Sequence, residues 1–258
     1  MKYYFTQVNR LSILKPYRNQ YLDSLSESQE LFLEIQIREG EYYLIKNDDD
    51  RSIGYIIFNG KILLEYFHED DHETILILQK VIQSFSLESC YCKSYDNLLR
   101  NTALSIGITA NIIGFSFRNY KSQNIKNAQD EISNRFANKN DFDYIWKINE
   151  EVFETKDELT DYIDDKKVII FSKDRKVIGF GIFSPSVVGK LEHDIGMLVA
   201  KEFRRKGYAT YILKFLADHC LENGWIPTAG CAVDNIGSKK TIIKIGFQNI
   251  FPLLEIKF

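Results

Sequence analysis

Short apolar runs separated by polar turns alternate with longer amphipathic segments through the C-terminal half of the chain. Periodic apolar positions predict helices in the longer segments, and alternating or continuous apolar runs predict strands in the shorter ones. In chain order we predict a helix over Asp141 to Val152 with Asp141 as its cap, a helix over Lys156 to Ile163, strands over Val168 to Phe171, Lys176 to Phe183 and Leu191 to Val199, a helix from about Arg205 to Asn223 ended by Gly224, a strand over Thr228 to Val233, a helix over Ser238 to Ile245, and closing strands over Phe247 to Phe258.

The N-terminal half repeats this order more faintly. We predict a helix over Ser26 to Arg38, strands over Tyr42 to Ile45, Ile53 to Phe58 and Lys61 to Phe67, a helix over Glu73 to Phe85, a strand over Ser89 to Lys93, a helix over Asp96 to Ser105, and an extended segment over Ile108 to Phe117. The matching order indicates an internal duplication. A polar segment, Lys121 to Asp130, shows no apolar period and predicts a linker. We expect two tandem domains, residues 1–121 and 126–258, each an α/β (α+β) domain with a mixed, mostly antiparallel sheet flanked by helices.

Composition narrows the functional classes. With 45% hydrophobic and 14% aromatic residues, the 258-residue chain has the means to form a substantial core. The net charge of −3 argues against a dedicated nucleic-acid binder, which is usually basic. No apolar run is long enough to span a membrane, the N-terminal residues do not resemble a signal peptide, and four cysteines do not form a disulfide framework. We therefore expect a cytoplasmic protein that binds neither membrane nor nucleic acid.

The most informative segment joins the strand that ends at Val199 to the helix that follows. Arg204, Arg205 and Lys206 place positive charge in the turn, and Gly207 lets the main chain approach a bound anion closely. A helix N-terminus presents unpaired backbone N–H groups and the positive end of the helix dipole. The turn is therefore predicted to bind phosphate oxygens.

The pattern Arg204-x-x-Gly207-x-Ala209 after an apolar strand resembles the pyrophosphate-binding signature of the GNAT superfamily of N-acetyltransferases. Further along, Asn235-x-x-Ser238 precedes the run Lys244-Ile245-Gly246-Phe247, which resembles the second part of that signature, where a short helix ends at Gly-Phe. The two motifs stand in the family's order and spacing, and the resemblance covers about residues 126–258. It implies a tandem-GNAT architecture whose C-terminal half carries the motifs.

The resemblance also implies a co-substrate, acetyl-CoA, and the residues that hold it. The pyrophosphate would lie on the amides of the basic turn, and Asn235 would reach the pantetheine arm, although an asparagine there also serves as a helix cap. The implied coenzyme contacts are Met197, Leu198, Val199, Arg204, Arg205, Lys206, Gly207, Tyr208, Ala209, Thr210, Asn235 and Ser238.

Acetyl transfer to an amine needs a base for the ammonium and a donor for the developing oxyanion. The resemblance implies that the donor is a strand amide at Leu198 or Val199. For the base, the cluster Glu192-His193-Asp194 at the start of the same strand holds the candidates. His193 points to one face of the strand, and Glu192 and Asp194 point to the other. Any of the three is also acceptable as a solvated strand-end residue, and the sequence leaves the choice open.

The departing thiolate needs a proton, and here the chain departs from the family. Many members place a tyrosine seven residues after the asparagine, whereas this chain has Ile242. Tyr208 and Tyr211 lie on a different helix. The acid could then be Cys231, Ser238 or a water, or the thiolate could depart without an acid, and the sequence leaves these alternatives open.

The N-terminal half carries His68 to Glu73 where the signature should fall. The four carboxylates of this segment would repel a pyrophosphate, so we expect no coenzyme A there. His68 and His72 invite a metal interpretation, as do Cys90 and Cys92, but neither pair has a third ligand, so we expect no metal.

These residues favour an N-acetyltransferase that moves the acetyl group of acetyl-CoA to a primary amine of a small molecule, by direct attack in a ternary complex. The alternatives are a non-catalytic acyl-CoA-binding sensor or scaffold, and a transferase with a bulkier acyl donor. The closing strands allow pairing with a second copy, so a homodimer stays open. The sequence does not identify the acceptor.

Overall fold

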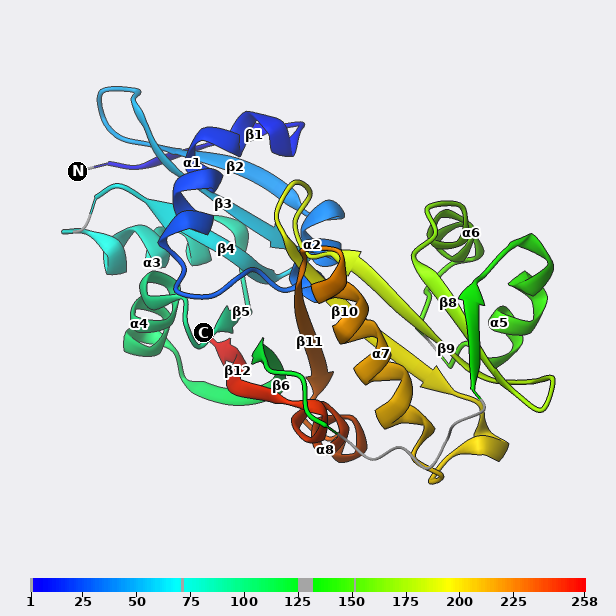
Figure 1. The fold of residues 1–258 in the computed structure, drawn as a ribbon. Coiled ribbons are helices and arrows are strands. Elements are labelled where there is room, and N and C mark those ends of the chain that lie inside the picture. The colour runs from blue at the N-terminus through cyan, green and yellow to red at the C-terminus, as the bar shows by residue number, and fades with distance from the viewer. Residues whose placement is uncertain (1, 71, 125–131, 151) are drawn as a thin grey trace. The chain divides into compact units, whose positions relative to one another are not determined.

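The structure is a computed structural model that describes residues 2–70, 72–124, 132–150 and 152–258. Residues 125–130 of the predicted linker, Asp71 of the acidic segment and Glu151 of a predicted helix lie outside the described residues. The chain divides into two compact units (Figure 1). Unit 1 consists of Met1–Ser116, Ala232–Asp234 and Phe251–Phe258, and unit 2 consists of Phe117–Cys231 and Asn235–Ile250. The strands β6 (Thr109–Tyr120) and β12 (Phe247–Lys257) contribute residues to both units.

Unit 1 holds a sheet in the order β1-β2-β3-β4-β5, and the end of β12 pairs with β5. Its elements are β1 (Tyr4–Val8), α1 (Leu11–Ser24), α2 (Leu31–Arg38), β2 (Glu41–Lys46), β3 (Ser52–Asn59), β4 (Ile62–His68), α3 (Thr74–Phe85), β5 (Ser89–Lys93) and α4 (Asn97–Ile106). Neighbouring strands are antiparallel except for the parallel pair β4–β5. One apolar cluster packs the sheet against α3 and α4, and a second packs it against α1 and α2.

Unit 2 repeats this plan in the order β11-β10-β9-β8-β7. Its elements are β7 (Ser133–Phe136), the 3-10 turn η1 (Lys139–Asp141), α5 (Phe142–Ile148), α6 (Lys156–Asp164), β8 (Val168–Lys173), β9 (Lys176–Pro185), β10 (Glu192–Val199), the 3-10 turn η2 (Lys201–Phe203), α7 (Tyr208–Glu222), β11 (Ile226–Ala232) and α8 (Ile236–Ile245). Again one pair, β10–β11, is parallel and the others are antiparallel. The two units confirm the predicted α/β (α+β) class, in which mostly antiparallel sheets are flanked by helices.

The two faces of the unit 2 sheet are covered differently. On one face, Phe180 and Leu198 belong to an apolar cluster with residues of α5 and α6. On the other face α7 comes so close that a Cβ on Gly181 would lie 2.6 Å from a methyl of Leu216. Because Met197 is the register partner of Gly181, odd-numbered residues of β10 point toward α7 and even-numbered ones point away.

Most predicted elements are present, but α1, β1 and β7 were not predicted. The buried face of α1 is formed by Leu14, Arg18 and Tyr21, so a buried arginine interrupts the apolar period that the sequence analysis looks for. The predicted helix Ser26 to Arg38 is wrong in its first part, because only Leu31–Arg38 is helical. In β7 the burial pattern is exposed at every position, so no apolar alternation marks it.

The helix α5 of unit 2 is shorter than predicted. The helix α5 ends at Ile148, where the side chain of Asn149 binds both the N–H (2.8 Å) and the carbonyl (2.7 Å) of Phe153. The predicted cap Asp141 makes no side-chain cap bond to α5, and instead accepts from the Asn138 N–H at 2.8 Å.

Among the described residues, no helix combines the length and apolarity that a membrane crossing requires.

Candidate active site

The basic turn of unit 2 lies between the end of β10 and the start of α7. Its backbone enters the left-handed region twice, at Arg205 (φ 60°) and at Gly207 (φ 84°). Because these residues are not helical, α7 begins at Tyr208, three residues later than the predicted start near Arg205. A left-handed residue directly before a helix is well suited to glycine, which carries no Cβ penalty there.

The turn is open to solvent at its charged positions. Arg204, Arg205, Lys206 and Gly207 are exposed, whereas the side chains of Tyr208 and Thr210 are buried and hold the first turn of α7 in place. The carbonyl of Gly207 accepts from the Tyr211 N–H at 3.2 Å. The amides of Tyr208, Ala209 and Thr210 precede that bond in the helix, so they have no intrahelical acceptor. They are the donors that an anion at this turn would use.

The strands β10 and β11 pair over a short distance only. Their parallel register covers Glu192 to Asp194, whereas β10 stays paired with β9 from His193 to Val199. The later part of β10 therefore has one backbone edge that β11 does not cover. Ala200 and η2 separate this divergence from the basic turn in sequence, but Arg204 Nε donates to the Val199 carbonyl at 2.9 Å, so the two features lie side by side and form one continuous site.

Hydrogen bonds show which amides lie along that uncovered edge. The carbonyl of Leu191 binds Ile226 of β11, and the amide of Ala200 binds Ile178 of β9. Backbone groups alternate along a strand, so odd-numbered residues of β10 face β11 and even-numbered ones face β9. The amide of Leu198 is thereby engaged with β9, and Val199 faces the uncovered edge. Of the two expected oxyanion donors, this geometry favours Val199, with Met197 two residues before it on the same edge.

The predicted base cluster separates onto two faces of β10. His193 is buried, stacks on Trp225 with ring centroids 4.2 Å apart, and places its Nδ1 3.0 Å from the Leu191 carbonyl. This arrangement is that of a packing residue on the α7 face. Glu192 and Asp194 are partly exposed on the opposite face.

Asp194 belongs to a small polar cluster that no local sequence pattern predicts. Its Oδ2 lies 3.5 Å from Thr228 Oγ1, which in turn lies 3.5 Å from Ser186 Oγ. Both hydroxyl residues are buried, Thr228 completely. Thr228 is the parallel register partner of Asp194, so only the β10–β11 pairing brings them together.

The second motif lies on α8. Asn235 caps this helix, and its side chain accepts from the Ser238 N–H at 3.0 Å. The structure therefore shows the cap role of Asn235, and a contact of Asn235 or Ser238 with pantetheine stays a prediction. Ile242 is buried, so the α8 position that carries a tyrosine in many family members has no hydroxyl. Burial raises the pKa of the Cys231 thiol, which makes it a weaker acid for protonating a thiolate.

Unit 1 has the same divergence between its parallel strands, but the space is used differently. The pair β4–β5 is formed only at Ile62 and Leu63. Asp96 caps α4 three residues after β5 ends, as Asn235 caps α8 three residues after β11 ends. Its Oδ2 accepts from Tyr21 at 2.7 Å, and Tyr21 accepts from Lys93 Nζ at 2.6 Å.

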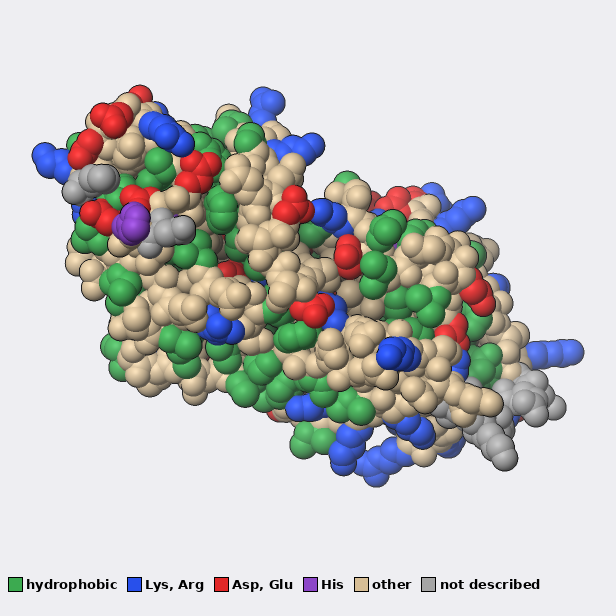
Figure 2. All heavy atoms as spheres, turned by 60° about the vertical axis from the view of Figure 1, so that its left-hand side comes forward, with side chains coloured by type: hydrophobic (Ala, Val, Ile, Leu, Met, Phe, Trp, Pro, Cys, Tyr) green, Lys and Arg blue, Asp and Glu red, His purple; other side chains and the backbone are tan. Residues whose placement is uncertain are grey.

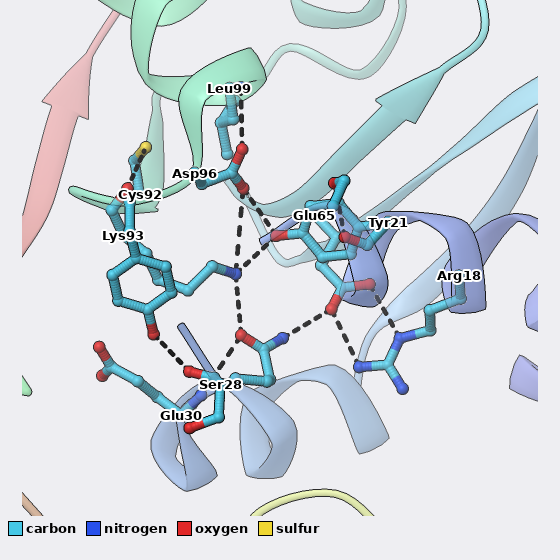
Figure 3. A network of polar contacts seen from close by, with 12 residues as sticks. Arg18, Tyr21, Ser28, Glu30, Glu65, Cys92, Lys93, Asp96 and Leu99 are labelled. Carbon is cyan, nitrogen blue, oxygen red and sulfur yellow. Dashed lines mark hydrogen bonds and ion pairs between the residues drawn. The ribbon is translucent and has the colours of Figure 1, made fainter. Parts of the chain in front are cut away.

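A buried ionic network continues from Lys93 across unit 1 (Figure 3). Lys93 donates to Gln29 at 2.8 Å, and Gln29 donates to Glu65 at 2.7 Å. Glu65 also accepts two bonds of 2.9 Å from Arg18, which forms a second ion pair with Glu34. All five side chains are almost fully buried. Charged and amide groups thus fill the part of unit 1 that lies beside its diverging strands.

The acidic segment of unit 1 lies at the end of β4. His68 is buried, His72 is exposed, and Tyr3 donates to Asp70 at 3.1 Å and to Glu73 at 2.7 Å. Figure 2 shows acidic side chains beside a histidine on the face that it draws. Within the described ranges, no group of three or more His, Cys, Asp or Glu side chains is arranged to hold a metal ion.

Comparisons with known proteins agree with this architecture. Residues 10–120 match a family model described as an acetyltransferase (GNAT) domain, and residues 134–247 match one described as the acetyltransferase (GNAT) family. The two matches confirm the predicted duplication. A search of curated proteins gave no significant match.

Solved structures with the same fold span the whole chain. An acetyltransferase from the GNAT family of Colwellia psychrerythraea has a TM-score of 0.87 at 17% identity, covering 99% of each chain. A GCN5-related N-acetyltransferase from Sphaerobacter thermophilus has a TM-score of 0.64 at 11% identity, covering 99% of this chain and 95% of that one. A tandem GNAT protein from the clavulanic acid biosynthesis pathway has a TM-score of 0.57 at 9% identity, covering 99% and 98%. From the two family matches, one in each half, the chain belongs to the GNAT acetyltransferases and carries two GNAT domains in tandem.

Proposed function

We propose that this protein transfers the acetyl group of acetyl-CoA to a primary amine of a small molecule, and that unit 2 holds the active site. The family implies acyl transfer from acetyl-CoA. The observation that carries the proposal is the continuity of the basic turn at Gly207 with the uncovered edge of β10. The turn offers amides to a diphosphate, and the edge offers the Val199 amide to a thioester carbonyl.

Asp194 is the base that we assign. It lies on the face of β10 opposite the stacked ring of His193, and Thr228 Oγ1 lies 3.5 Å from its carboxylate. Asp194, directly or through a water, takes the proton that the ammonium must lose. The amine nitrogen then bonds to the carbonyl carbon while the Val199 amide stabilises the oxyanion, and the C–S bond breaks. On becoming an amide, the nitrogen loses its second proton, and a water passes this proton to the departing thiolate, because Ile242 offers no hydroxyl for the transfer.

Unit 1 is proposed to bind no coenzyme. Its acidic segment has carboxylates at the position in the order of elements where unit 2 has Arg204 to Gly207. Its ionic network joins Glu65 of β4 to Lys93 of β5, the two strands that diverge. Unit 1 therefore provides no second active site. A metal has no part in the proposed chemistry.

Titration calorimetry with acetyl-CoA tests the coenzyme site. Gly207→Glu puts a carboxylate and a Cβ at a left-handed position of the basic turn, so we expect binding to be lost. Gly189→Glu is the matched control, because Gly189 is also exposed and left-handed (φ 85°) in unit 2 but lies in the β9–β10 turn. Normal binding by Gly207→Glu would overturn the proposal.

A second function, an acyl-CoA-binding sensor or scaffold without turnover, is favoured by one observation. The buried Ile242 leaves the α8 position of the family's tyrosine without a hydroxyl. Release of free thiol from acetyl-CoA, measured over a panel of primary amines, separates the two functions. Turnover with any amine supports the transferase, and coenzyme binding without turnover across the panel supports the sensor.

A further inference from the structure

The guanidinium of Arg204, the first residue of the basic turn, is held at two points. Its Nε donates to the Val199 carbonyl at 2.9 Å, and its Nη2 forms an ion pair with Glu150. The side chain is 42% exposed, so the contacts leave it only partly solvated. An arginine fixed in this way connects the end of β10 to the segment after α5.

Glu150 is well placed to serve as the anchor. Besides Arg204 it binds Lys201 of η2, with 3.3 Å between Nζ and Oε1. Hydrogen bonding to Arg204 is the main cause that lowers the pKa of the Glu150 carboxyl, so the group is ionised at neutral pH. The preceding residue, Asn149, is buried and tied by two side-chain bonds to Phe153. The carboxylate therefore projects from a segment that is itself held in place.

Backbone conformation supports the same interpretation. Glu150 has a positive φ of 42°, a conformation that costs a non-glycine residue about 1 kcal/mol. Such residues persist where the surrounding contacts determine them. The ion pairs to Lys201 and Arg204 are the contacts available here.

We propose that Glu150 and Arg204 are positioning residues that brace the coenzyme turn, and that Arg204 is not itself a phosphate ligand. The brace fixes the Val199 carbonyl, and with it the Val199 amide on the same edge, before the coenzyme arrives. The diphosphate is then met by the amides of Tyr208, Ala209 and Thr210 and by Arg205, which makes no ion pair within the described part of the chain. The inference rests on the proposed function, since it assumes that coenzyme A binds at this turn.

Charge substitutions distinguish a brace from simple electrostatics. Removing a carboxylate beside a basic turn should strengthen the binding of a diphosphate if only charge matters. Glu202 is the matched control, an exposed glutamate of η2 with no ion pair among the described residues. We expect Glu202→Gln to bind coenzyme A as well as or better than the wild type. We expect Glu150→Gln to bind it about fivefold more weakly, despite the identical change in charge.

The test is calorimetric titration of the full chain with coenzyme A, at low and at moderate ionic strength. Arg204→Lys, which keeps the charge but loses the forked contacts, should weaken binding about as much as Glu150→Gln, and the double variant should be no weaker than either. The difference between Glu150→Gln and Glu202→Gln should persist with added salt, because a brace is not a long-range effect. The melting temperatures of Glu150→Gln and Glu202→Gln should both stay close to that of the wild type, because both glutamates are solvent-exposed and exposed ion pairs contribute little to stability.

Three results overturn the inference. If the wild type binds coenzyme A and Glu150→Gln binds it equally or more tightly, the brace is wrong and the proposed function stands. If the wild type binds no coenzyme A, the proposed function fails and the brace fails with it. A loss of affinity that is additive in the double variant would show that Glu150 and Arg204 act separately, which also contradicts the proposal.

Discussion

At the scale of single residues, the proposal of Asp194 as the base rests on which face of β10 each side chain occupies. His193 has the side chain best suited to proton transfer near neutral pH, yet its ring lies flat on Trp225 and one nitrogen approaches the Leu191 carbonyl. Asp194 is less suited by chemistry but lies on the other face, partly exposed and next to Thr228. Geometry precedes pKa in selecting a base.

Substitution of these two neighbours gives a paired prediction. With the amine found by the thiol-release screen, Asp194→Asn should lower kcat by about 10²-fold to 10⁴-fold and leave KM for acetyl-CoA unchanged. His193→Phe keeps an aromatic ring against Trp225, so it should retain most of the activity. Steady-state kinetics of both variants is the measurement. The reverse pattern, an inactive His193→Phe beside an active Asp194→Asn, would assign the base to the histidine.

The ionic network of unit 1 contains three carboxyl groups, Glu34, Glu65 and Asp96, and two cations, Arg18 and Lys93. Burial raises the pKa of Glu34, against the opposing effects of Arg18, and the neighbouring Glu65 raises it further. Burial likewise raises the pKa of Asp96. The network therefore has one carboxyl group more than it has cations. An unbalanced negative charge costs free energy in a buried site, and protonation of one carboxylate removes that cost.

This charge imbalance predicts opposite effects of two similar substitutions. Because the folded pKa of Glu34 is raised, its protonated form is favoured by folding, and that stability is lost as pH rises from the unfolded value through the folded one. Glu34→Gln should remove this loss. In urea unfolding, the free energy of unfolding of the variant should therefore rise relative to that of the wild type as pH rises, by about 1.4 kcal/mol per unit of difference between the folded and unfolded pKa. Glu65→Gln breaks the paired bonds to Arg18 and should cost about 3–5 kcal/mol. Parallel pH profiles for the wild type and Glu34→Gln would contradict the assignment.

At the scale of elements, the strands of both units could be predicted because their side chains alternate or form continuous apolar runs. The helix α1 could not, because Arg18 stands at a buried position of its period and is neutralised by Glu65 and Glu34, both far away in sequence. The position of the basic turn could also be predicted, because glycine and the neighbouring cations are local signals. The later start of α7 could not be predicted, because it follows from a left-handed backbone at Arg205, a conformation that the arginine residue type does not indicate.

The arrangement of the site around the turn depends on pairing between distant segments. The Thr228–Asp194 contact needs the parallel register of β10 and β11, and the stacking of His193 needs Trp225, which follows α7. The bond from Arg204 to Glu150 joins residues 54 apart in sequence. Local sequence patterns indicate the element on which each residue lies, whereas contacts between elements depend on the folded register.

At the scale of the whole molecule, the chain does not divide at one point. The last residues, Phe251–Phe258, belong to unit 1, although the rest of β12 and all of α8 belong to unit 2. Leu253 to Lys257 pair with β5 in antiparallel register, and Ile256 lies in a unit 1 core cluster with Cys90 and Cys92. Unit 1 therefore needs the C-terminal end of the chain to complete its sheet.

This arrangement predicts that a change at the C-terminus is felt in unit 1 first. Ile256→Ala should cost about 2–5 kcal/mol, because Ile256 is 1% exposed and its removal leaves a cavity. The buried thiols of Cys90 and Cys92 should then react faster with a maleimide under native conditions, while the turn at Gly207, which belongs to unit 2, should still bind coenzyme A. Lys257→Ala, at the next and exposed position, is the control and should change neither rate nor affinity. Thiols that stay protected in Ile256→Ala would contradict the prediction, because the change in a unit 1 core would then have failed to open unit 1. Coenzyme binding lost together with thiol protection would show that the two units do not respond separately, because the same change would then have unfolded unit 2 as well.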